Sequence, residues 1–190
     1  MLKLKLNNFL MVAAQWFRTL IAHIVRPMLL VTGGKDDYFA GTVAPEARLM
    51  AKVFRANGDT EDLGIVSTKL VTTAFVNNVV DNLVAETTAF GDYKFHGMGT
   101  DNTAENVSDT ALGTQVESRA TGSQSEGASA NIYQSVGTVT ASAARAIVEH
   151  GLFNASSGGV LMDRSVFSVI NLADGDAIQF TYELTVPAGG

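Results

Sequence analysis

The residues best suited to acid and base chemistry in this sequence are His150 and the carboxylate beside it, Glu149. A histidine oriented by a carboxylate can act as a general base or as a metal ligand. Adjacent residues of a β-strand point to opposite faces, however, so Glu149 is badly placed to orient His150 in the strand expected there. We therefore expect both residues to be peripheral and structural, and their replacement to leave assembly nearly intact.

The other histidines and the acidic residues lack the spacing of metal ligands. His23 and His96 have no partners at the spacing of a zinc site, and the chain contains no cysteine. Several aspartates raise the question of calcium, but none follows the Asp-x-Asp-x-Asp-Gly arrangement that wraps one ion. These are Asp101, Asp109, Asp163, Asp174 and Asp176. We predict no metal and no cofactor.

Motifs for a nucleophile or for phosphate binding are also missing. The serines do not occur in a Gly-x-Ser-x-Gly elbow, and no histidine is placed as an obvious partner. Gly33-Gly34-Lys35 lacks both the first glycine of a phosphate loop and the Ser or Thr after its lysine. Together these missing motifs predict that the chain is not an enzyme.

The composition describes a globular chain with apolar surface to cover. A chain of 190 residues can bury roughly 70% of the surface that its unfolded form exposes. Its hydrophobic share of 46% and charged share of 17% exclude wholesale disorder. The absence of cysteine suits the reducing cytosol. We expect part of the apolar surface to be covered by other chains.

Charge is distributed unequally along the chain. Residues 1–62 contain eight Lys/Arg and six Asp/Glu, whereas residues 63–190 contain five Lys/Arg and thirteen Asp/Glu. The resulting net charges are +2 and −8. A body at −8 repels the phosphate backbone, so we expect no direct contact with nucleic acid.

Residues 1–62 are expected to form an N-terminal arm that carries an amphipathic helix. The helix should end near Arg26, because Pro27 cannot continue it. The longest uncharged stretch, residues 6–17, is shorter than the ~20 residues of a membrane span, so we predict no membrane anchor. The apolar face is our candidate interface and contains Phe9, Val12, Trp16, Leu20 and Ile24.

Three partners for this arm stay open. It packs on its own domain, docks on a neighbouring subunit, or lies on a membrane surface. A signal peptide is a further interpretation, because Lys3 and Lys5 precede the apolar run.

Residues 63–190 are expected to form a β-rich body. The clearest strand is residues 176–186, where Ile178, Phe180, Tyr182, Leu184 and Val186 alternate with polar or small residues, so one face should be buried. Other strands are expected over residues 64–71, 93–98, 112–119, 130–140, 145–153, 159–163 and 165–172. The polar stretches 97–111 and 121–129 are expected to be surface loops with too little apolar content for a core.

One helix is expected in the body, over residues 73–86, with Thr72 or Thr73 as its cap. Apolar residues recur along it at the spacing of a single stripe. We expect this stripe to seal one side of a sheet, with Val76, Val80 and Leu83 buried.

Several short segments of the body, in a fixed order, carry a resemblance to known proteins. They are Leu-Val-Thr-Thr-Ala at 70–74, Tyr-Lys-Phe-His-Gly-Met-Gly-Thr at 93–100, Asp-Thr-Ala-Leu-Gly-Thr at 109–114, Arg-Ala-Thr-Gly-Ser-Gln at 119–124 with Ala-Asn-Ile-Tyr at 130–133, Val-Glu-His-Gly-Leu-Phe at 148–153, and Leu-Met-Asp-Arg-Ser-Val-Phe at 161–167. Over about residues 64–190 the sequence resembles a family of tailed-bacteriophage virion proteins.

The resemblance implies a capsid cement or decoration protein, built as a jelly-roll-like antiparallel β-sandwich. Such a protein binds the outside of the shell and stabilises it through subunit contacts, often as a homotrimer. Its partners would be the major capsid protein or neighbouring virion subunits. The location implied is the capsid surface of a virion made in the host cytoplasm.

Three alternatives belong beside this interpretation. A tail or fibre-associated structural protein can use the same fold. A carbohydrate or host-receptor-binding module would use the long polar loops, but residues 97–129 contain no Phe, Tyr or Trp to form a sugar platform. An enzyme such as a glycoside hydrolase would require two facing carboxylates about 5–10 Å apart.

Overall fold

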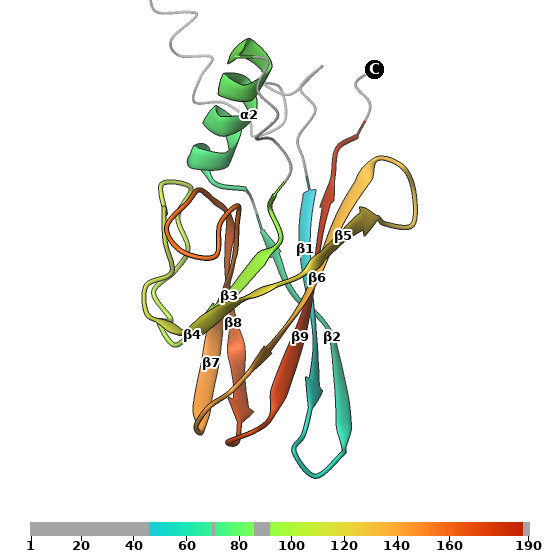
Figure 1. Cartoon of the computed structure of the whole chain (residues 1–190), viewed down its shortest axis with the longest axis vertical. Coiled ribbons are helices and arrows are strands. Elements are labelled where there is room, and N and C mark those ends of the chain that lie inside the picture. Colours follow the sequence, from blue (N-terminus) through green and yellow to red (C-terminus); the bar gives the residue numbers. More distant parts are fainter. Residues whose placement is uncertain (1–45, 70, 86–91, 188–190) are drawn as a thin grey trace, which may run out of the picture. The chain divides into compact units, whose positions relative to one another are not determined.

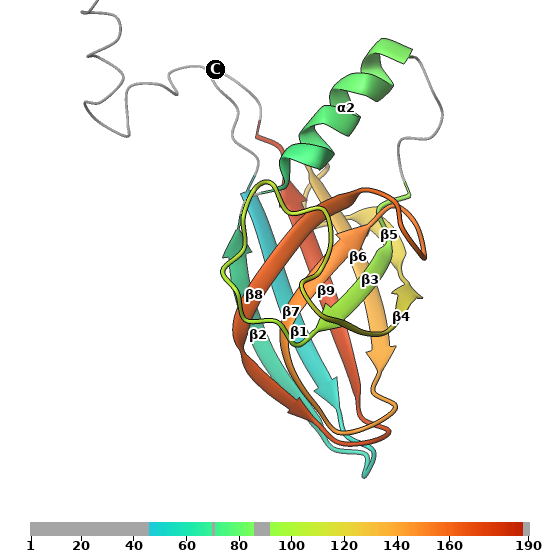
Figure 2. The same ribbon diagram turned by 90° about the vertical axis from the view of Figure 1, so that its left-hand side faces the viewer.

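The computed structural model describes residues 46–69, 71–85 and 92–187, and this part of the chain is mainly β. Its strands are β1 (Glu46–Phe54), β2 (Thr60–Lys69), β3 (Phe95–Gly99), β4 (Gln115–Thr121), β5 (Ser123–Glu126), β6 (Ile132–Thr140), β7 (Arg145–Phe153), β8 (Leu161–Leu172) and β9 (Ala177–Thr185), and its helix is α2 (Thr73–Ala85). The strands form two sheets, with orders β2-β1-β9-β6-β5 and β4-β3-β7-β8, and all neighbours are antiparallel (Figures 1 and 2). The expected β-sandwich type of fold is confirmed.

Strand β9 shows why these residues form a sandwich. Ile178, Phe180, Tyr182 and Leu184 alternate with less buried residues and are all at most 4% exposed. The strand lies between β1 and β6 and pairs with both, so its backbone polar groups are bonded on either side. Val186 was expected to extend this buried face, but it lies beyond the end of β9 and is 51% exposed.

The sandwich begins earlier than the sequence indicated. Strand β1 pairs along its whole length with β9, and Ala47, Leu49, Ala51 and Val53 point into the core. The boundary expected between residues 62 and 63 therefore falls inside β2, and the described part of the sandwich starts at Glu46. The Ala, Leu and Met residues of β1 favour helix locally, and pairing with a strand about 130 residues later decides their structure.

Helix α2 begins as the sequence predicted. The backbone N–H of Phe75 donates to Thr72 Oγ1 at 3.2 Å, which makes Thr72 the cap. The Thr72 hydroxyl also donates to the carbonyl of Leu161 in β8. Phe75 is buried and lies edge-on against Tyr93, with 5.1 Å between ring centroids. The first turn of the helix is thus fastened to the sandwich.

The apolar stripe of α2 is not buried, and that expectation was wrong. Val76, Val80 and Leu83 are 47%, 53% and 76% exposed. The helix lies at one end of the sandwich and does not cross the face of a sheet (Figures 1 and 2). Phe75, and in part Val79, are the apolar residues of α2 that reach the core, while the stripe faces away.

The segment between β3 and β4 is a long loop over residues 100–114, and one of its side chains is buried against the sheet. Leu112 in this loop is buried with Phe153 and Leu161, and Phe95 packs against the three. This second small cluster is separate from the main core between the sheets. Leu112 was expected to begin a strand over residues 112–119, but β4 begins at Gln115, and Leu112 closes this cluster over the strands from the loop.

Two further strand expectations need correction. Residues 123–126 were expected to lie in a loop but form β5, a fully exposed strand that pairs with β6. Its Ser-Gln-Ser-Glu sequence shows no apolar alternation because neither of its faces is buried. The two strands expected over 159–163 and 165–172 are one continuous strand, β8.

Candidate functional site

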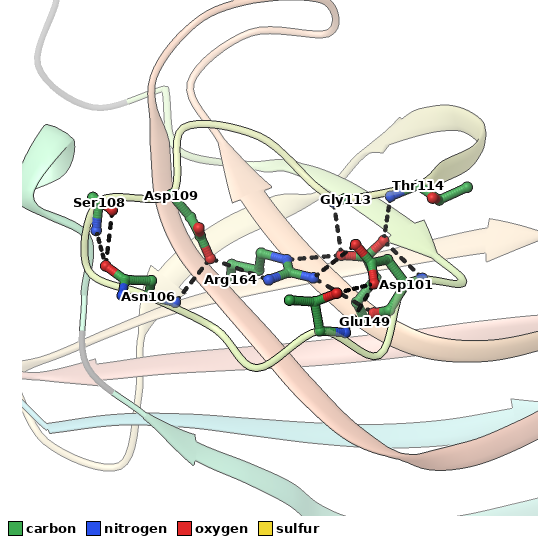
Figure 3. Close-up of polar contacts among 9 residues, drawn as sticks. Asp101, Asn106, Ser108, Asp109, Gly113, Thr114, Glu149 and Arg164 are labelled. Atoms are coloured by element: carbon green, nitrogen blue, oxygen red, sulfur yellow. Dashed lines mark hydrogen bonds and ion pairs between the residues drawn. The ribbon is translucent and has the colours of Figure 1, made fainter.

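The most concentrated set of charged side chains in the described structure lies under the 100–114 loop. Arg164 of β8 and Glu149 of β7 come from neighbouring strands, and Arg164 Nε donates to Glu149 Oε2 at 2.8 Å. The two side chains are 4% and 0% exposed. Arg164 Nη1 also reaches Asp109 Oδ2 in the loop at 3.1 Å (Figure 3). One arginine therefore bridges the sheet and the loop above it.

The Glu149 carboxylate holds both ends of this loop. It accepts backbone N–H groups from Gly113 at 3.0 Å, Thr114 at 2.8 Å and Asp101 at 3.2 Å, besides the Arg164 bond (Figure 3). A Cβ atom at Gly99 would lie 2.3 Å from Glu149 Oε1, so only glycine leaves room for the carboxylate. A carboxylate offers about four acceptor positions, and four donors already bind this one, so it serves the structure and has no acceptor position left for a substrate.

The loop is also fixed from within. Asp101 Oδ1 accepts the N–H and hydroxyl of Thr103, and Asn106 Oδ1 accepts the N–H of Ser108 at 3.0 Å. The bonds from Thr103, and after them the charge of Arg164, hold the pKa of Asp101 below its usual range. The carbonyl of Val107 accepts the N–H of Thr73, which ties the loop to the start of α2. The polar side chains of this loop therefore fix its conformation through hydrogen bonds.

A second polar group lies on the inner side of the same sheet. His96 Nδ1 and His150 Nε2 are 3.0 Å apart, and His96 Nε2 is 2.9 Å from Ser135 Oγ. Ser135 belongs to β6 in the other sheet, so this chain of contacts links the two layers. A Cβ atom at Gly137 would come within 2.4 Å of the His96 ring. The histidines are therefore packed as tightly as the apolar core around them.

Burial sets the protonation of these histidines. It lowers the pKa of His96 to about 4, and burial together with the charge of His96 lowers the pKa of His150 well below 6.5. Both rings are therefore neutral at pH 7. Glu149 and His150 point to opposite faces, as strand alternation predicted, but the expectation that they are peripheral was wrong, because both are 0% exposed.

Asp163 on β8 is another buried ionisable group. Its Oδ1 accepts the Ser165 hydroxyl at 2.7 Å, and its Oδ2 has no hydrogen-bond partner among the described residues. Burial raises the pKa of Asp163 to about 7, against the Ser165 bond and together with the charge of Glu105. Tyr182 Oη is likewise buried without a partner in the described part of the chain. The core between the sheets thus contains several polar groups that are enclosed and away from solvent.

Two surface hollows lie outside this network. One, of about 720 Å³, is lined by residues that include Arg55 and Asp176, which form an ion pair at 3.0 Å. The other, of about 460 Å³, contains Tyr133, whose hydroxyl accepts from Gln124 and donates to the Tyr93 carbonyl. Arg55, Asp176 and the Tyr133 hydroxyl are therefore already bonded within the protein.

Comparison with known proteins adds no relative. No protein-family model, curated protein or solved structure matches this chain significantly.

Among the residues that the structure describes, no three acidic or histidine side chains are grouped to hold a metal ion. No helix of this described part is long and apolar enough to cross a membrane. The predicted interface residues Phe9, Val12, Trp16, Leu20 and Ile24 lie outside the described residues.

The motifs that carried the resemblance supply most of both polar networks. Segment 93–100 contributes His96, segment 109–114 contributes Asp109 and Gly113, segment 148–153 contributes Glu149 and His150, and segment 161–167 contributes Arg164. Sequence reasoning missed Arg164 and the role of the loop. The sequence did contain a signal for this network. Segments 109–114, 148–153 and 161–167 each contain a charged residue of it, namely Asp109, Glu149 and Arg164.

Proposed function

We propose that this chain is a structural protein of a tailed-phage virion, a capsid cement or decoration protein that self-associates and binds the outside of the shell. A jelly-roll-like connection of the strands and a helical N-terminal arm are part of this proposal. The return of the last strand, β9, to pair with the first, β1, supports such a connection. The observation that carries the proposal is the exposed apolar stripe on α2.

The polar groups support a structural role, because they are already used within the protein. Arg164 and Glu149 bind the loop, and the histidine pair joins the sheets. Catalytic groups must be within hydrogen-bond reach of a substrate. The candidates in the described residues are enclosed instead, and they make a small domain rigid, which suits a protein that reinforces a shell.

The exposed apolar surface supports attachment to other subunits. Val76, Val80, Leu83 and Val84 all lie on α2, at one end of the sandwich (Figure 2). Contiguous apolar surface on a soluble domain marks a site of protein association more often than it serves the monomer. A cement protein must contact neighbours, and this end offers the surface for that contact.

Locating the chain in a density map of intact particles tests the proposal. We expect it on the outer face of the shell, in copy numbers that follow the shell symmetry. Purified chain added back to particles lacking it should bind and should raise the temperature at which the particles release their contents. Density in the tail or fibres would favour the tail-associated alternative and overturn the cement function, and absence from particles would overturn both.

A further inference from the structure

Helix α2 presents an apolar stripe that nothing in the described structure covers. Val76, Val80, Leu83 and Val84 follow the spacing i, i+4, i+7 and i+8, and Leu83 and Val84 are 76% and 80% exposed. Asp81 is the one charged residue of the helix, and at 3.6 residues per turn it lies roughly 110° around the helix from the centre of the stripe. The stripe is therefore both apolar and uncharged.

We propose that this stripe is a self-association interface, in which α2 packs against α2 of other copies of the chain. The acidic part of the chain disfavours contact with its own copies, since residues 46–190 contain eight Lys/Arg and seventeen Asp/Glu. Two copies that meet through most of this surface would oppose carboxylates, which costs free energy. The uncharged stripe lets them approach without that repulsion. This inference deepens the proposed function, which includes self-association, by naming the interface.

The width of the stripe indicates how many copies meet. From Leu83 to Val84 it spans roughly 100° of the helix surface, at about 100° per residue. The seam of a two-stranded coiled coil is narrower than this. A stripe this wide can contact two neighbouring helices at once, as in a bundle of three or more.

The available area leads to the same conclusion. A helix of 13 residues is about 20 Å long, and one pair of such helices buries less than the ~800 Å² per partner of a stable interface. Contact with two neighbours doubles the buried surface of each helix. Val107 extends the apolar surface, because it is 49% exposed and its carbonyl is bonded to the first residue of α2. We expect an assembly larger than a dimer that dissociates on dilution.

The mass of the full chain, measured by sedimentation over a range of concentrations, tests the interface. Leu83→Asp and Val80→Asp place a charge on the stripe without disturbing the core, because both side chains are more than half exposed. Each should weaken assembly at least tenfold and leave the thermal unfolding of the monomer unchanged. The matched control is Val169→Asp in β8, which is 54% exposed and should assemble like the wild type.

A second measurement does not depend on charge. The chain contains no cysteine, so Leu83→Cys introduces a single thiol. Under oxidation it should form a disulfide-linked dimer at protein concentrations where the wild type is assembled. Val169→Cys should form little such dimer under the same conditions.

Several outcomes would overturn this proposal. A wild-type chain that is monomeric at every concentration, or a Leu83→Asp variant with unchanged mass, excludes the α2 interface. A monomer in which Leu83→Asp alters the fluorescence of Trp16, the single tryptophan, would assign the stripe to the N-terminal arm. A monomer that needs Leu83 to bind particles would assign it to the shell. A monomer would also remove self-association from the proposed function, whereas the virion location itself is decided only by the position of the chain in particles.

Discussion

At the scale of single residues, Arg164 decides whether the 100–114 loop stays closed over the sheet. Replacing it by Met removes the bonds to Glu149 and Asp109 and leaves the Glu149 carboxylate buried without its cation. Breaking a buried ion pair from one side costs about 3–5 kcal/mol. We expect Arg164→Met to lower the free energy of unfolding by about that amount in urea denaturation, and to expose the loop to proteolysis.

A surface arginine provides the control for this prediction. Arg48 forms an ion pair with Glu183 at 3.1 Å, but its side chain is 42% exposed. Exposed pairs contribute less than about 1 kcal/mol, so Arg48→Met should change the unfolding free energy little. Equal effects of the two substitutions would show that the buried cluster contributes nothing beyond a surface pair.

The buried histidines should make the protein sensitive to acid. In the unfolded chain a histidine binds a proton near pH 6.5, whereas in the folded protein the pKa of His96 is about 4 and that of His150 is also far below 6.5. The unfolded state therefore binds more protons between pH 6.5 and about 4. The histidine contribution to stability is complete above pH 6.5, and we expect the free energy of unfolding to fall as the pH falls through this window.

Protonation of Asp163 has the opposite effect on the free energy of unfolding, over a pH range that overlaps that of the histidines. Because its folded pKa of about 7 lies above its ordinary value of 3.8, the folded state binds the extra proton, and its contribution falls as the pH rises. Two histidines outweigh one aspartate, so the net effect of acid is destabilising. Asp163→Asn should steepen the loss of stability between pH 6.5 and 4, and His150→Gln should flatten it. Unchanged slopes in urea titrations of both variants would contradict this assignment.

The orientation of Glu149 and His150 could be predicted from the sequence, but their contacts could not. Strand alternation correctly separated Glu149 from His150, because that rule is local. The partners of these residues were not predictable, since Glu149 meets Arg164 fifteen positions away and His150 meets His96 fifty-four positions away. Burial followed from those distant contacts, which is why both residues were wrongly expected to be peripheral.

At the scale of elements, the cap of α2 links the helix to the sandwich. Thr72 is 2% exposed, and its hydroxyl serves both the Phe75 N–H and the Leu161 carbonyl. Loss of a cap costs about 1 kcal/mol, and the carbonyl left unpaired adds about 1–3 kcal/mol. We expect Thr72→Ala to lower the free energy of unfolding by about 2–4 kcal/mol in thermal or urea denaturation.

Thr72→Ser keeps the hydroxyl and is the matched control. It should retain most of the lost stability, because the same two hydrogen bonds can form. If Thr72→Ser destabilises the protein as much as Thr72→Ala, the methyl group and not the hydroxyl holds the helix.

Elements with alternating apolar residues were predictable, and those decided by pairing were not. Strand β9 followed from the sequence because its alternation records one buried face. Strand β5 has four exposed polar residues, and only its pairing with β6 makes it a strand. For α2 the apolar stripe was correctly found, but periodicity says that a face is apolar and not what covers it.

At the scale of the whole molecule, the described part of the chain contains one main core shared by both sheets. The buried apolar residues of this core come from strands of both sheets and from the first turn of α2. Because the buried residues of the two sheets pack against one another, we expect the sandwich to fold without residues 1–30.

The sequence of the N-terminal arm predicts an amphipathic helix with one apolar face. The face formed by Phe9, Val12, Trp16, Leu20 and Ile24 is costly to leave in water, and at ~25 cal/mol per Å² its burial on a partner contributes several kcal/mol. If this face binds the shell, deleting residues 1–30 should spare the melting temperature of the sandwich and its assembly through α2, and should abolish attachment to particles. Calorimetry, sedimentation and co-purification with particles measure the three properties separately. Unchanged attachment would place the arm on its own domain, and unfolding of the truncated chain would do so too, because only an arm that completes the core is needed to keep the sandwich folded.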